Sequence, residues 1–152
     1  MEKDKIQIEE IRSELPWDLF LIADPSREAI VKYLKKGHAY VAKIDGQVFG
    51  GYILVKRENS VYELMNMAVY PEFQNQGLGT RLLKALIEAL KKRGAKKLEV
   101  GTGTFGYQLR FYQKVGFRVD FIDKDFFLKN YPEPIFENGI QHKDMLRLVL
   151  KL

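Results

Sequence analysis

Two glycines ahead of a predicted helix are placed to bind an anion. Segment 64–83 begins as an apolar run that ends at Pro71, continues through polar residues, and becomes an amphipathic pattern after Gly77 and Gly79. The first amides of a helix have no intrahelical partner and lie at the positive end of its dipole, so glycines there let a phosphate approach bare backbone. This order of residues predicts a phosphate site between a buried strand and a helix.

A second glycine pattern offers a rival site. Gly101, Gly103 and Gly106 match the G-x-G-x-x-G dinucleotide fingerprint, and Asp123 follows at about the expected 20 residues. That fold needs several further strand-helix-strand units, and too few residues follow Asp123 to build them. A P-loop is excluded because no Lys-Ser or Lys-Thr dipeptide follows any glycine-rich segment. The later glycines are better explained as residues that let a strand end and a helix begin in a crowded place.

Hydrophobic periodicity predicts the elements that position these loops. Residues 61–69, the helix after Gly79 and residues 97–102 form a strand-helix-strand unit, whose right-handed crossover makes the two strands parallel. The remaining pattern predicts an α/β (α+β) fold with a mostly antiparallel sheet of six to seven strands, one parallel pair and about four helices. The other expected strands are 6–11, 38–44, 48–56, 117–122 and 144–151, and the other helices are 17–23, 27–36 and 107–114, with an irregular segment up to Gly139.

Composition limits the class of protein. The 152 residues predict one domain, 1–152, and a hydrophobic content of 46% with 30% charged residues is ordinary for a globular protein. The formal charge of +5 favours acidic partners but gives no strong nucleic-acid signal, and no apolar run is long enough to span a membrane. Segment 1–5 is too acidic for a signal or transit peptide, and the absence of cysteine favours a cytoplasmic location.

Two segments together resemble a known family. The run from Gln74 through Gly77 to Gly79 is similar to the Q/R-x-x-G-x-G/A signature of the GNAT superfamily of acyl-CoA-dependent N-acyltransferases. Phe111-Tyr112-Gln-Lys-Val-Gly116-Phe117 resembles that family's second motif, in which a helix ends in a glycine before the next strand. The resemblance covers nearly the whole chain, its specific motifs lie within 66–117, and it implies a GNAT-like fold whose parallel strand pair splays apart.

The resemblance implies that the chain binds acetyl-CoA as a co-substrate, without a metal. In the family, backbone amides of the signature loop hold the pyrophosphate, and the splayed strand faces the pantetheine and thioester. Arg81 adds charge near the phosphates or is simply solvated, and Thr104 or Gln108 takes the place of an asparagine that the family often has. The implied acetyl-CoA residues are Met67, Ala68, Val69, Gln74, Asn75, Gln76, Gly77, Leu78, Gly79, Thr80, Arg81, Thr104 and Gln108.

The resemblance also implies the chemistry. Tyr112 matches the family's general acid, which protonates the departing thiolate. Glu63 stands where some members carry a general base. The alternative is that Glu63 is a surface carboxylate and that a water chain acts as the base. The implied reaction is direct transfer of an acetyl group to a primary amine in a ternary complex. The acceptor, a small molecule or a peptide, is expected between 17–33 and 123–141. A non-catalytic acyl-CoA sensor of the same fold is the alternative, and a homodimer is compatible with the sequence.

Overall fold

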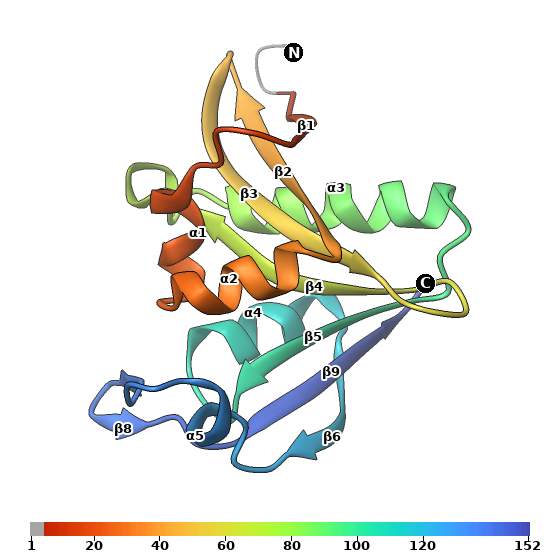
Figure 1. The fold of residues 1–152 in the computed structure, drawn as a ribbon. Helices are drawn as coiled ribbons and strands as arrows, with labels where there is room; N and C mark the ends of the chain where they lie inside the picture. The colour runs from red at the N-terminus through yellow and green to blue at the C-terminus, as the bar shows by residue number, and fades with distance from the viewer. Residues whose placement is uncertain (1–4) are drawn as a thin grey trace.

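The computed structural model describes residues 5–152, so most of the segment on which the leader-peptide expectation rests lies outside it. Figure 1 shows the α-helices on both sides of one twisted sheet. The helices are α1 (Trp17–Ala23), α2 (Arg27–Leu34), α3 (Leu78–Lys92), α4 (Tyr107–Val115) and α5 (Phe126–Asn130), with a 3-10 turn, η2 (Pro71–Phe73). The strands are β1 (Gln7–Ile11), β2 (Gly37–Ile44), β3 (Gln47–Lys56), β4 (Val61–Val69), β5 (Lys97–Gly103), β6 (Arg118–Asp123), β7 (Phe136–Glu137), β8 (Ile140–Gln141) and β9 (Met145–Lys151).

The main sheet has seven strands in the order β1-β2-β3-β4-β5-β9-β6, and β4 with β5 is the parallel pair among them. The predicted fold class is therefore confirmed. Helices α1 and α2 cover one face, and α3 and α4 cover the other, where most of the core lies. Within residues 5–152, no helix combines the length and apolar composition that crossing a bilayer requires.

Helix α3 forms where its apolar pattern predicts. Its inward residues recur every three or four positions, which places them on one face against the sheet. Gly77 precedes the helix in the left-handed conformation, with φ of 77°, and Lys91 and Lys92 lie in its last turn, where cations complement the dipole. The buried residues of this helix are Leu78, Leu82, Leu83, Leu86, Ile87 and Leu90.

Strands β4 and β5 pair over only part of their length. Their register runs from Val61 opposite Lys97 to Leu64 opposite Val100 and then stops. At the same level the β3–β4 register skips Met65, which is the mark of a bulge. Beyond this point β4 pairs with β3, and β5 pairs with β9. The two central strands thus separate toward their C-terminal ends, as the family resemblance implies.

One local expectation was wrong. The segment after β6 was expected to be irregular, but it contains α5 and the β7–β8 hairpin. These elements have five and two residues, too few to leave a periodic pattern. The cap of α2 is Ser26, whose hydroxyl accepts the Ala29 amide, whereas Asp24 closes α1 and accepts the Ser26 amide.

Candidate active site

A groove of about 400 Å³ lies where α3 begins beside the free end of β4. Of the predicted acetyl-CoA residues, three do not line it: Gln76, Arg81 and Thr104. Sequence reasoning missed Tyr107 and Phe111 of α4, which form the opposite wall. The predicted residues that line the groove are Met67, Ala68, Val69, Gln74, Asn75, Gly77, Leu78, Gly79, Thr80 and Gln108.

The loop before α3 is braced by its own glutamines. Gln74 Nε2 donates to the Val69 carbonyl at 2.8 Å, and Gln76 Nε2 donates to the Glu72 carbonyl at 3.3 Å. A Cβ at Gly77 would meet nothing within 4 Å, so the space beside this turn is open. The first amides of α3 therefore meet a free surface that suits a phosphorylated ligand.

A narrow throat of about 90 Å³ continues from the groove between the separated strands. Tyr112 lines both spaces, although only 5% of its surface is exposed. Its ring packs edge-on against Phe111 and Phe117, at centroid distances of 5.1 and 5.3 Å, which fixes its orientation. Burial raises the pKa of Tyr112 above that of a free phenol, so the hydroxyl keeps its proton at neutral pH.

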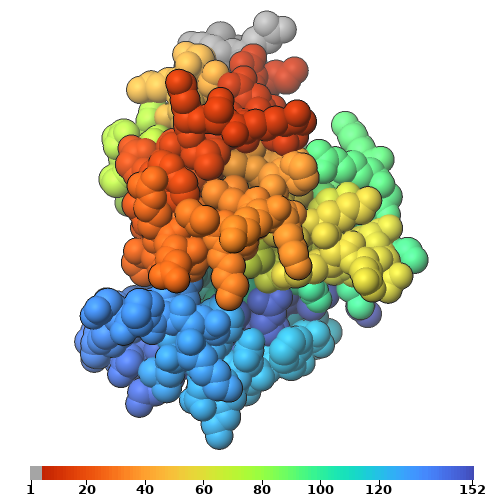
Figure 2. Space-filling model, viewed as in Figure 1, coloured from red at the N-terminus to blue at the C-terminus, as the bar shows by residue number. Residues whose placement is uncertain are grey.

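A larger cavity of about 1040 Å³ opens on the other side of the throat. Its walls come from α2, from β4, β5 and β9, and from segment 121–132, so the two segments expected to bind the acceptor both contribute. Figure 2 shows this side of the molecule, where the orange surface of α1 and α2 lies directly above the blue surface of the segment after β6. Asp24, Leu64 and Tyr131 line the cavity and the throat alike. The three spaces therefore adjoin one another and share wall residues.

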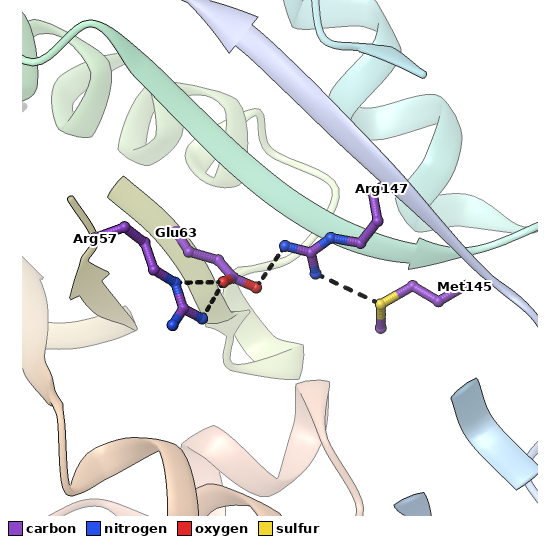
Figure 3. Close-up of polar contacts among 4 residues, drawn as sticks. All are labelled: Arg57, Glu63, Met145 and Arg147. Atoms are coloured by element: carbon purple, nitrogen blue, oxygen red, sulfur yellow. Dashed lines mark hydrogen bonds and ion pairs between the residues drawn. The ribbon is translucent and has the colours of Figure 1, made fainter. Parts of the chain in front are cut away.

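Glu63 lies in the wall of the large cavity, held by two arginines (Figure 3). Its Oε1 accepts from Nε of Arg57 at 3.0 Å and from Nη2 of the same guanidinium, and its Oε2 accepts from Arg147 Nη2 at 2.8 Å. The carboxylate is 5% exposed. Glu63 is therefore no isolated surface carboxylate, and three of its roughly four acceptor positions are filled by guanidinium N–H groups.

A second buried polar network surrounds the throat. The Tyr33 hydroxyl donates to Asp24 Oδ2 at 3.1 Å and accepts from Asn66 Nδ2 at 3.0 Å, and Asn66 Nδ2 also donates to the Phe20 carbonyl at 2.9 Å. Asn66 Oδ1 is buried without a hydrogen-bond partner. Sequence reasoning missed this network, although a lone asparagine within the apolar strand Val61–Val69 was a usable signal.

The rival glycine pattern serves internal packing. A Cβ at Gly103 would overlap the ring of His142, and one at Gly106 would overlap the carboxylate of Glu137. His142 Nε2 and Glu137 Oε1 are 2.9 Å apart, so these side chains are bound to each other. The space that a dinucleotide would use is filled by the chain itself. Among residues 5–152, no group of three or more His, Asp or Glu is placed to hold a metal ion.

A sheet that opens beside a helix N-terminus, with a buried tyrosine in the gap, defines a site for a phosphorylated, extended ligand. A sequence model described as the acetyltransferase (GNAT) family matches residues 8–117. The uncharacterized N-acetyltransferase YvbK of Bacillus subtilis (strain 168) is 44% identical over 100% of this chain and 99% of its own length.

Solved structures agree with this match. A GNAT family acetyltransferase from Elizabethkingia anophelis, with acetyl-CoA bound, is 45% identical with a TM-score of 0.91, over 98% of this chain and 99% of that one. A Bacillus subtilis acetyltransferase in complex with CoA is 44% identical with a TM-score of 0.88, over 97% and 99%. The chain therefore belongs to the acetyltransferase (GNAT) family and is an N-acetyltransferase.

Proposed function

We propose that residues 1–152 act as one domain that transfers an acetyl group from acetyl-CoA directly to a primary amine in a ternary complex. The observation that carries this proposal is the row of three adjoining spaces at the gap in the sheet. The donor groove and the acceptor cavity meet at a throat lined by Tyr112, with Met67 of β4 also in its wall. Two substrates that enter from opposite sides meet there without a covalent enzyme intermediate. A cysteinyl intermediate is excluded because the chain has no cysteine.

Acetyl-CoA occupies the groove in this proposal. Its pyrophosphate lies against the amides of Gly77 to Thr80, where the helix dipole favours negative charge. The bound acetyl-CoA of the Elizabethkingia enzyme and the bound CoA of the Bacillus subtilis enzyme support this assignment. Arg81, in the exposed first turn of α3, contributes positive charge nearby. Thr104 is exposed beyond the groove, and Gln108 is the better placed of the two for the pantetheine contact.

The thioester carbonyl lies beside the free edge of β4. Because β5 no longer pairs with Met67–Val69, backbone amides on that edge are free of the ladder. An amide aimed at the carbonyl oxygen stabilises the charge that develops on it during attack. Tyr112 then donates its proton to the departing thiolate, and its raised pKa keeps it protonated until that step.

The attacking amine must be neutral. A free amine with a pKa near 10.4 needs roughly 4 to 5 kcal/mol to lose its proton at pH 7, so a base assists the reaction. We assign this role to Glu63, acting through water in the acceptor cavity when one of its guanidinium bonds is exchanged. The geometry supports a relay better than direct contact, since arginines occupy both carboxylate oxygens.

The test is thiol release from acetyl-CoA with a panel of small amines, polyamines, aminoglycosides and peptides. Because the protein has no cysteine, a thiol reagent detects only the CoA produced. At least one amine should release CoA and gain one acetyl group by mass spectrometry. Binding of acetyl-CoA with no release for any amine would favour the alternative, a non-catalytic acyl-CoA sensor.

The enzyme's location and assembly are also part of the proposal. We place it in the cytoplasm as an enzyme of small-molecule or peptide amines, because its sequence has no cysteine and cellular acetyl-CoA is its donor. Fractionation of the native cells checks this placement. The homodimer stays a prediction, and sedimentation of the purified protein measures it.

A further inference from the structure

Asp24 is a buried carboxylate that pairs with no cationic side chain among residues 5–152. It is 7% exposed and is the residue that ends α1. Asp24 lines the throat, and the preceding residue, Ala23, lines both the donor groove and the throat. Its hydrogen bonds come from neutral donors, the Ser26 amide at 3.1 Å and the Tyr33 hydroxyl at 3.1 Å. Within residues 5–152, no lysine, arginine or histidine forms an ion pair with it.

Glu63 provides the contrast within the same cavity. It is as buried as Asp24, yet two guanidinium groups pair with it. Buried charges in proteins are normally paired, because a carboxylate that leaves water without a counter-charge loses much of its solvation energy. The protein thus satisfies one buried carboxylate of the cavity internally and leaves the other for a cation from outside.

A second polar atom beside Asp24 also has no hydrogen-bond partner within the described part of the chain, residues 5–152. Asn66 Oδ1 is a buried acceptor without a hydrogen bond, and Asn66 lines the throat with Asp24. The Tyr33 hydroxyl donates a hydrogen bond to Asp24 and accepts one from Asn66. The side chains of Asp24 and Asn66 are therefore both within hydrogen-bond distance of the same oxygen atom. An ammonium group has three N–H donors and suits a site with a carboxylate and an amide oxygen.

We propose, resting on the proposed function, that Asp24 is the anchor for the ammonium group of the acceptor, with Asn66 Oδ1 as a second acceptor of its N–H bonds. The throat has about 90 Å³ and the cavity about 1040 Å³, so only the reacting end of the acceptor enters the throat. Asp24 selects cationic primary amines over neutral nucleophiles of the same shape and holds the nitrogen beside the thioester. Glu63, in the cavity wall, is left to receive the proton.

The experiment is a calorimetric titration of the CoA-saturated protein. The probes are n-butylammonium, 2-phenylethylammonium and spermidine, with 1-butanol and 2-phenylethanol as neutral counterparts of the first two. The variant is Asp24→Asn, which keeps an acceptor for the Ser26 amide, and thermal unfolding checks its fold. The control is Glu58→Gln, which removes an exposed carboxylate that lines neither the cavity, the throat nor the groove.

At least one ammonium probe should bind the wild-type protein more tightly than its alcohol, and Asp24→Asn should weaken that ammonium by roughly tenfold or more. Alcohol binding and the acetyl-CoA dissociation constant should not change, and Glu58→Gln should match the wild type. Equal affinity of Asp24→Asn for the ammonium probes would overturn the proposal. So would equal binding of ammonium and alcohol by the wild type, a result that needs no variant.

Thiol release separates this inference from the proposed function. If an amine releases CoA and Asp24→Asn leaves its KM unchanged, the anchor is wrong and the acetyltransferase reaction stands. If ammonium binding depends on Asp24 but no amine releases CoA, the anchor stands and the reaction is wrong. A rise in the acceptor KM with an unchanged KM for acetyl-CoA supports both.

Discussion

Leu64 and Val100 form the last register pair between β4 and β5. The throat lined by Tyr112 begins at this pair, and Glu63 lies one pair before it. On the N-terminal side of this pair, β4 and β5 are hydrogen-bonded to each other. On its C-terminal side, β4 pairs only with β3, and β5 pairs only with β9. The gap that results connects the groove of α3 to the cavity under α2. An interrupted parallel ladder thus gives the enzyme one entrance for each substrate.

Replacement of Tyr112 by phenylalanine tests the general acid. The ring contacts with Phe111 and Phe117 remain, so the fold should be retained. Turnover should fall by roughly 10²-fold or more, the range typical of general acid catalysis, while the KM for acetyl-CoA changes little. Steady-state kinetics of CoA release measures both constants. An unchanged turnover number would rule out the acid role.

Replacement of Gly77 by alanine tests the phosphate site. Gly94 is a matched control, because both glycines have φ near +80°, at 77° and 80°, and both face open space. Each alanine should cost about 1 kcal/mol or slightly more of folding free energy, the strain of a left-handed residue with a Cβ. Only Gly77→Ala should weaken acetyl-CoA binding by calorimetry, since its methyl group lies at the amides. Equal binding by both variants would contradict the assignment.

Replacement of Glu63 by glutamine tests the base. Without the carboxylate the amine must lose its proton to bulk solvent, so the pH optimum should move upward toward the amine pKa near 10.4. Glu99, which lies opposite Glu63 in the β4–β5 register, is the control. The pH profile of kcat/KM for the acceptor is the measurement. Identical profiles for Glu63→Gln and Glu99→Gln would leave Glu63 with a structural role.

Replacement of Tyr33 by phenylalanine tests the network above the throat. It removes the hydroxyl that bonds Asp24 and Asn66, so buried polar atoms lose partners. The free energy of unfolding should fall by about 1 to 3 kcal/mol. Tyr107, which is 65% exposed, serves as the control, and Tyr107→Phe should have a much smaller effect. Urea denaturation compares the two, and equal stabilities would show that the bridge contributes nothing.

The parts of the site that were predictable from sequence are local. The turn at Gly77 and the helix that carries Tyr112 each follow from residues a few positions apart, whose periodicity and glycines specify the backbone. The parallel pair β4–β5 followed from the rule that a strand-helix-strand unit forms a right-handed crossover, applied to three consecutive elements. The placement of the donor groove needed no distant contact.

The acceptor side was not predictable in this way. Glu63 and Arg147 are 84 residues apart, and Asn66 and Tyr33 are 33 apart, so no spacing in the sequence relates them. Asp24 lies at the end of α1, next to the Ser26 cap of α2, and nothing in this local pattern indicates a buried carboxylate beside the throat. Such contacts depend on how α1, α2 and β9 pack around the gap, and periodicity carries no information on that packing.

The central claim is that an amine attacks acetyl-CoA directly in the gap beyond Leu64 and Val100. Its most direct test is the initial rate of CoA release with acetyl-CoA and an active amine varied together. The account predicts double-reciprocal lines that intersect, as a ternary complex requires, and an N-acetylated product. Parallel lines, or CoA release that does not depend on the amine, would contradict it.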